Sequence, residues 1–145
     1  MTTVLDLQAR LRAVNIQDVA VKSIKQTDDE LIRWQKEQLF SGKTSTGGFI
    51  RPPYKPSTRA IKRKKGQPTD RVTLKDTGSF YDRIFVDIGT EVFNVGSEDN
   101  KESILTGEYK PTIFGLNKIS RAGYASDVRP VFVRNMENVT GLTIR

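Results

Sequence analysis

The sequence predicts an α+β fold, in which N-terminal helices and a C-terminal helix pack on a small antiparallel β-sheet and a long extended basic arm leaves the domain. Apolar residues recur at spacings of three and four near both ends of the chain, as in amphipathic helices. Two short runs rich in β-branched and aromatic residues lie on either side of Gly89, as in a hairpin. Residues 43–65 contain many basic side chains, interrupted by glycine and proline.

The first 41 residues are predicted to be helical. Residues 4–14 have the apolar spacing of a short amphipathic helix. A second helical region extends from Gln17 to Phe40. Thr27 followed by Glu30 is a capping-box pattern, which predicts a break and a new helix start near Thr27. Gly42 is predicted to lie just beyond the end of this region.

Residues 42–72 are predicted to form the extended basic arm. Glycines and prolines recur throughout this segment, which makes a helix or a central strand unfavourable. A segment of this length without regular structure is unusual inside a compact domain and is commonly ordered by a partner. Deletion of residues 43–66 is therefore expected to leave a soluble monomer that no longer assembles.

Residues 73–97 are predicted to form a turn and a β-hairpin. The run from Thr77 to Tyr81 indicates a turn or a single helical turn. Residues 83–88 and 91–95 alternate as two strands should, and Gly89-Thr90 suits a two-residue type II′ turn between them.

Residues 98–145 complete a single predicted domain of residues 1–145. A short helix is expected near residues 97–105, followed by a buried loop or short strand over 111–116. The last helix is expected to start at Asp127, with Pro130 in its tolerant first turn, and to stop at Gly141.

The composition narrows the functions that the chain can have. It contains no cysteine and no histidine, which excludes disulfides, thiolate metal sites and Ser-His or Cys-His catalytic groups. We therefore expect a protein that is not an enzyme and has no catalytic, metal or cofactor-binding residues. The chain begins without a signal-peptide pattern and has no apolar run of membrane-spanning length, so we expect synthesis in a reducing cytoplasm and no membrane contact.

The basic charge is concentrated in one segment. Net charge is +7, whereas residues 43–65 alone hold eight basic and no acidic side chains. Such a segment contacts a neighbouring subunit, contacts DNA phosphates in a salt-dependent way, or is simply solvated. The residues predicted to make subunit or DNA contacts are Lys43, Arg51, Tyr54, Lys55, Arg59, Lys62, Arg63, Lys64 and Lys65.

Two other patterns suggest chemistry more weakly. Gly42-Lys43-Thr44 imitates the end of a phosphate-binding loop, but Glu37 stands where that motif needs a glycine. Asp76, Asp82 and Asp87 can meet in space, which leaves a carboxylate metal-dependent enzyme as an alternative function.

Several short motifs follow one another in a recognisable order over residues 30–142. They are Gln38-Leu39-Phe40-Ser41-Gly42, Gly47-Gly48, Pro53-Tyr54, Ser57-Thr58, Lys64-Lys65, the run from Thr73 to Tyr81, and Ile113-Phe114-Gly115-Leu116. This order resembles the phage tail-completion and virion-morphogenesis proteins of the head–tail connector or neck, and is most similar to forms from phages of Bacteroides-type bacteria, including crAss-like phages. The chain departs from that family at residues 119–123, where Ile-Ser-Arg-Ala-Gly replaces a Pro-Ala-Arg-Pro-Phe segment.

The resemblance implies an α+β subunit of the virion that forms a homo-oligomeric ring between portal and tail. It implies contacts with the portal, the connector or other tail proteins, and double-stranded DNA in the channel, without catalytic residues or a cofactor. It also implies that Asp76, Thr77, Gly78, Phe114 and Gly115 form a structural motif. A nucleic-acid-binding module that uses the basic arm is the alternative.

Overall fold

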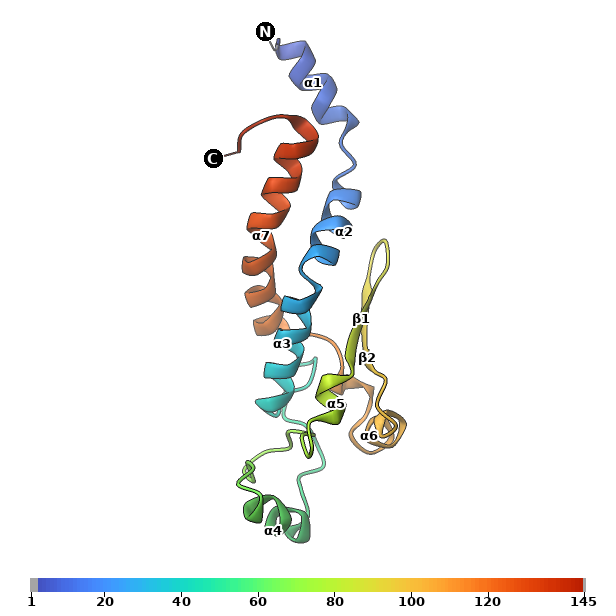
Figure 1. Cartoon of the computed structure of the whole chain (residues 1–145), viewed down its shortest axis with the longest axis vertical. Coiled ribbons are helices and arrows are strands. Elements are labelled where there is room, and N and C mark those ends of the chain that lie inside the picture. The colour runs from blue at the N-terminus through green and yellow to red at the C-terminus, as the bar shows by residue number, and fades with distance from the viewer. Residues whose placement is uncertain (1–2, 145) are drawn as a thin grey trace.

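The computed structural model describes residues 3–144 as an elongated α+β molecule (Figure 1). Helices extend along most of its length, and one two-stranded antiparallel sheet lies beside them. The helix α1 and the C-terminal end of α7 lie toward the same end of the molecule (Figure 1). The predicted fold class is therefore confirmed, with helices packed on a small antiparallel sheet.

The N-terminal region forms α1 (Val4–Ala13), α2 (Ile16–Gln26) and α3 (Asp28–Phe40). The break near Thr27 is confirmed, but the capping box is not, because the Thr27 side chain makes no cap hydrogen bond. Its hydroxyl instead donates to the Ser23 carbonyl at 2.8 Å and lies 2.7 Å from the Tyr124 hydroxyl. Gly42 has a φ of +73° beyond the end of α3, as a helix stop requires.

The C-terminal helix α7 (Lys118–Thr140) packs along α2 and α3 and is longer than predicted. It starts after Asn117, whose side chain accepts a hydrogen bond from the Ser120 N–H at 3.0 Å. The predicted start at Asp127 is wrong, and Pro130 lies inside the helix. A proline removes one backbone hydrogen bond inside a helix, and α7 continues through Pro130 while it packs along α2 and α3. The predicted stop at Gly141 is confirmed.

The hairpin consists of β1 (Ile84–Ile88) and β2 (Phe93–Ser97), with Ile88 opposite Phe93. The existence of both strands is confirmed, but the second starts two residues later than predicted. Residues 89–92 therefore lie between the two strands. The Gly89 N–H bonds to the Val92 carbonyl at 2.9 Å and encloses Thr90 and Glu91, so the predicted turn at Gly89-Thr90 is wrong in its position.

Three short elements connect the hairpin to its neighbours. They are α5 (Ser79–Asp82), which confirms the predicted helical turn, α6 (Glu102–Tyr109), and the 3₁₀ turn η1 (Pro111–Ile113). A helix was predicted near residues 97–105, but α6 begins at Glu102, and Ser97 belongs to β2, where it pairs with Ile84 of β1. The loop after α6 is buried at Ile113 and Leu116, as expected.

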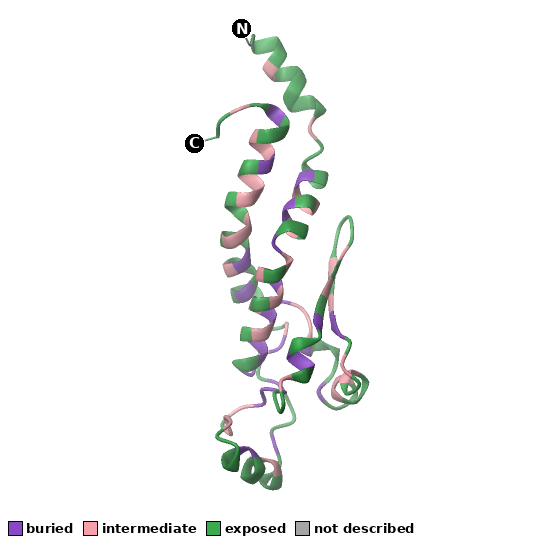
Figure 2. Cartoon of the chain, viewed as in Figure 1, coloured by how far each residue is buried: buried purple, intermediate pink, exposed green. Residues whose placement is uncertain are grey.

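Residues 42–72 do not form an extended arm. Pro56–Lys64 form the helix α4, which lies at the end of the molecule away from α1 (Figure 1). The segments on either side of α4 enter the main core, where Ile50, Tyr54 and Val72 are buried (Figure 2). The prediction failed because Pro56 occupies the first turn of a helix, where its missing N–H costs nothing. Deletion of residues 43–66 would remove part of the core.

Two buried glutamines of α3 hold the loop that precedes α7. The Gln35 amide donates to the Ile113 carbonyl at 3.0 Å and accepts from the Gly115 N–H at 2.9 Å. Gln38 donates to the Gly115 carbonyl and accepts from the Asn117 N–H, both at 2.8 Å. The two side chains therefore pair with the loop backbone as a neighbouring strand would.

We predict that Gln35→Met will lower the free energy of unfolding by about 2–4 kcal/mol, because two backbone groups lose their partners and each costs about 1–3 kcal/mol. The measurement is urea unfolding followed by circular dichroism. The control is Gln8→Met, at an exposed position of α1, which should change the stability by less than about 0.5 kcal/mol. Equal effects of the two substitutions would contradict the role assigned to Gln35.

Candidate interaction surface

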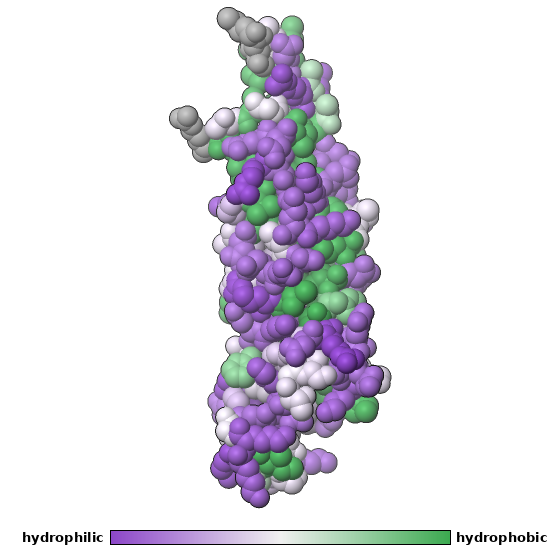
Figure 3. Space-filling model, viewed as in Figure 1, coloured by the Kyte–Doolittle hydropathy of each residue, from purple (hydrophilic) through white to green (hydrophobic). Residues whose placement is uncertain are grey.

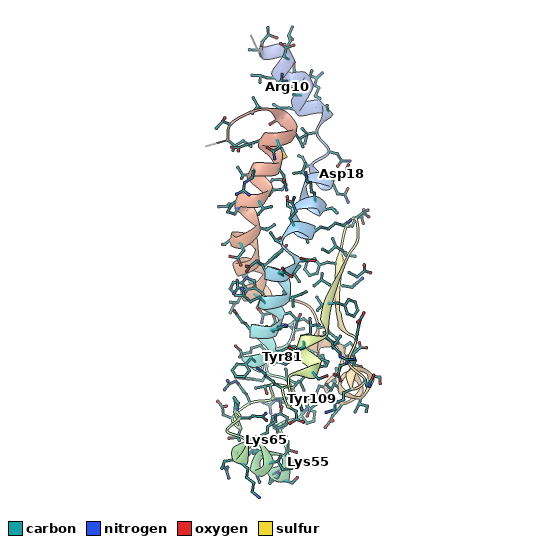
Figure 4. All side chains as sticks on the ribbon, viewed as in Figure 1. Arg10, Asp18, Lys55, Lys65, Tyr81 and Tyr109 are labelled. Atoms are coloured by element: carbon teal, nitrogen blue, oxygen red, sulfur yellow. The ribbon has the colours of Figure 1, made fainter. Side chains whose placement is uncertain are left out.

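The basic residues of the sequence collect on and beside α4. Figure 4 labels Lys55, which precedes the helix, and Lys65, which follows it, at the same end of the molecule. The helix itself carries Arg59, Lys62, Arg63 and Lys64. No acidic side chain lies in α4 to neutralise this charge.

Tyr54 and Lys62 were predicted to make partner contacts, but both are buried and hold the segment in place. The Tyr54 hydroxyl accepts from the backbone N–H groups of Thr73 and Leu74, both at 3.1 Å. The Lys62 ammonium donates to the Lys75 carbonyl at 2.8 Å and lies 4.8 Å from the centre of the Tyr54 ring. Their role is to fasten α4 to residues 73–75, which sequence spacing alone did not indicate.

The Asp76-Thr77-Gly78 turn meets the end of the basic helix. The Lys65 ammonium lies 2.5 Å from the Asp76 carboxylate, and this hydrogen bond lowers the pKa of Asp76. Gly78 has a φ of +93° at the start of α5, a conformation that disfavours side chains with a Cβ. The turn therefore orients α5 and receives one charge of the basic segment.

The other predicted motif, Phe114-Gly115, meets the helix α5 that follows this turn. The ring of Phe114 lies 5.8 Å from that of Phe80, centre to centre, and Phe80 belongs to α5. Gly115 has a φ of +96° and is the residue that both buried glutamines contact. Two motifs that are far apart in the sequence therefore form one packed unit.

Five of the predicted contact residues are exposed and form no salt bridge within residues 3–144: Arg51, Lys55, Arg59, Arg63 and Lys64. Lys43 differs from them, because it is half-buried and its ammonium lies 3.5 Å from the centre of the Phe49 ring. The surface available to a partner is thus smaller than predicted, and it is centred on α4.

A groove of about 530 Å³ opens beside α4, between this helix, the turn at residues 74–80 and α6. Ile61, Leu105 and Tyr109 line it, and lysine and carboxylate side chains stand around them. Burial raises the pKa of Tyr109 to about 12, so its phenol stays neutral at physiological pH. Sequence reasoning missed this groove, for which the only local signal is Ile61 within a basic run.

The carboxylates that suggested a metal-dependent enzyme do not cluster. Within residues 3–144, no three Asp, Glu, His or Cys side chains lie close enough together to hold a metal ion.

No helix in the same part of the chain has the length and apolarity needed to cross a membrane.

Many large apolar side chains are exposed. Thirteen are exposed in the described residues, against fourteen hydrophobic residues in the core. Figure 3 shows hydrophobic side chains reaching the surface along the length of the molecule. The helix α1 has no buried residue, and its Val4 and Leu5 are 80% and 75% exposed. This apolar surface at one end and the basic helix at the other are the two candidate interaction surfaces.

No protein-family model, curated protein or solved structure matches this chain.

We predict that Lys62→Met will lower the free energy of unfolding by about 1–3 kcal/mol, because the Lys75 carbonyl loses a charged donor. Lys64→Met removes the same charge from an exposed position of the same helix, and should change the stability by less than about 0.5 kcal/mol. Chemical denaturation of both variants measures the difference. A Lys62→Met protein as stable as Lys64→Met would mean that Lys62 does not fasten the helix.

Proposed function

We propose that this chain is a structural protein of a tailed bacteriophage particle, which forms a homo-oligomeric ring at the head–tail connector, the neck or the tail-completion region. The order of its motifs, from Gln38 to Leu116, resembles that of the virion-morphogenesis proteins. Its partners in this proposal are further copies of itself and the portal, connector or tail proteins next to the ring.

The observation that carries the proposal is the large accessible surface of the single chain. A compact monomer of 16.4 kDa exposes about 7,500 Å², whereas this chain exposes 9591 Å². The excess is about 2,000 Å². A standard protein interface buries about 800 Å² on each partner, and a ring subunit has two neighbours. The excess therefore has the size that two such interfaces need.

Part of this excess accessible surface lies on the helix α1. It has ten residues, none of them buried, and isolated helices shorter than about 12–15 residues are marginal in water. Its apolar side chains Val4, Leu5 and Leu11 are more than half exposed. A neighbouring subunit that covers them would supply the packing that this chain does not provide.

We predict that the protein is present in many copies in purified virions, and mass spectrometry of gradient-purified particles tests this. Leu5→Ser combined with Leu11→Ser should leave the domain folded but reduce its incorporation into particles, because the uncovered apolar surface is lost. Gln8→Ser, in the same helix, is the control, because it lowers helix propensity without removing an apolar side chain. Absence of the wild-type protein from virions would refute the proposed function.

A second candidate function is nucleic-acid binding, which the five exposed basic residues near α4 favour, since none of them forms a salt bridge within residues 3–144. The two functions are compatible if the ring surrounds DNA.

If α4 binds duplex DNA, we predict an affinity that falls steeply with salt, by a slope of about −0.9 for each phosphate contacted. Replacing Arg59, Arg63 and Lys64 by Ala should make that slope shallower by about one for each cation removed. Fluorescence anisotropy with a labelled duplex measures both slopes. Identical slopes for the wild type and this variant would rule out α4 as the DNA contact.

A further inference from the structure

A second charged segment has the opposite sign to the basic one. Residues 82–108, called here the acidic segment, contain seven Asp or Glu and two Lys or Arg, which gives a net charge of −5. The basic segment, residues 43–65, carries +8. The overall charge of +7 therefore hides two segments of opposite charge.

The charges of the acidic segment are available at the surface. It forms β1, β2 and α6, and Glu98 and Glu108 are exposed while Glu102 is half-exposed. None of its seven carboxylates forms a salt bridge within residues 3–144. Asp99 is the most constrained of them, because hydrogen bonds from the Ser79 hydroxyl and the Lys101 N–H hold it and lower its pKa.

The two segments do not neutralise each other within one chain. The helices α4 and α6 border the same groove, yet no salt bridge joins them in the described residues. Both lie toward the end of the elongated molecule that is opposite α1 (Figure 1). Subunits standing side by side with their long axes aligned can therefore bring α4 of one copy to α6 of the next.

Each charged segment also exposes one large aliphatic side chain. Ile61 of α4 is 56% exposed, and Ile104 of α6 is 66% exposed. Protein interfaces commonly have an apolar centre surrounded by polar side chains. Ile104 provides an exposed apolar side chain on the acidic side, whereas Ile61 lines the groove beside α4 in its own chain. The charges of the two segments would therefore select the partner and its orientation.

We propose that the outer face of α4 in one subunit docks on the acidic segment of a second copy of this chain. This inference rests on the proposed ring. Arg59, Arg63 and Lys64 supply the basic side of the contact, and Glu98, Glu102 and Glu108 supply the acidic side. Because the two surfaces are different, the contact is heterologous, and a heterologous contact repeated by a rotation that closes generates the proposed ring.

The test uses two charge-reversed variants of the full chain. The first carries Arg59→Glu, Arg63→Glu and Lys64→Glu, and the second carries Glu98→Lys, Glu102→Lys and Glu108→Lys. In each variant alone the two surfaces have the same sign, so each should stay monomeric in sedimentation velocity. An equimolar mixture should assemble, because the reversed α4 of one variant meets the reversed acidic segment of the other.

Salt and a matched variant provide the controls. Assembly of the wild type and of the mixture should weaken between about 0.1 M and about 1 M salt, where the Debye length falls from about 10 Å to about 3 Å. Lys22→Glu, Lys25→Glu and Arg129→Glu reverse the same number of exposed charges on α2 and α7, and this variant should assemble like the wild type. Thermal unfolding establishes that every variant is folded.

Three results would overturn the inference: a wild-type chain that stays monomeric at about 0.1 M salt, a single reversed variant that assembles normally, or a mixture that stays monomeric. A basic-reversed variant that assembles but loses DNA binding would likewise overturn it, and would identify α4 as a DNA contact. The proposed function fails separately, if the wild-type protein is missing from virions.

Discussion

The structure depends on the pairing of two buried glutamines with a loop backbone. Gln35 and Gln38 together pair with the Ile113 carbonyl, both backbone groups of Gly115 and the Asn117 N–H, which otherwise would lose hydrogen bonds on burial. Burying a loop costs free energy when its backbone groups lack hydrogen-bond partners. The two side-chain amides supply these partners where the chain turns toward α7. The position of the longest helix therefore follows from two polar side chains of α3, with the fully buried Leu39 and Ile113 nearby.

The same loop connects the core to the candidate interaction surface. It brings Phe114 against Phe80, so that the loop supports α5 and the turn before it. That turn carries Asp76, which pairs with Lys65 at the end of α4. The residues of the two sequence motifs are thus positioning residues, and what they position is a basic helix at one end of the molecule.

Buried polar groups and exposed charged groups are treated differently in this protein. Every buried side-chain nitrogen and oxygen in residues 3–144 has a hydrogen-bond partner. On the surface, by contrast, no salt bridge in the described part of the chain joins the basic segment to the acidic segment. Buried polar groups need hydrogen-bond partners because their desolvation costs free energy. Exposed charges remain hydrated, so leaving them without an ion-pair partner costs the folded monomer little stability.

The sequence by itself determined the features that depend on neighbouring residues. Apolar periodicity, the glycines at 42 and 141, and the alternation over residues 83–88 predict the N-terminal helices, two helix ends and the hairpin, because local backbone preferences dominate there. Only the tertiary structure decided that Pro130 lies within a helix, that residues 56–64 are helical, and that Tyr54 and Lys62 are buried. The physical reason is that their partners, the backbone groups of Thr73 to Lys75 and the surfaces of α2 and α3, are distant in the sequence and meet them only when the chain folds.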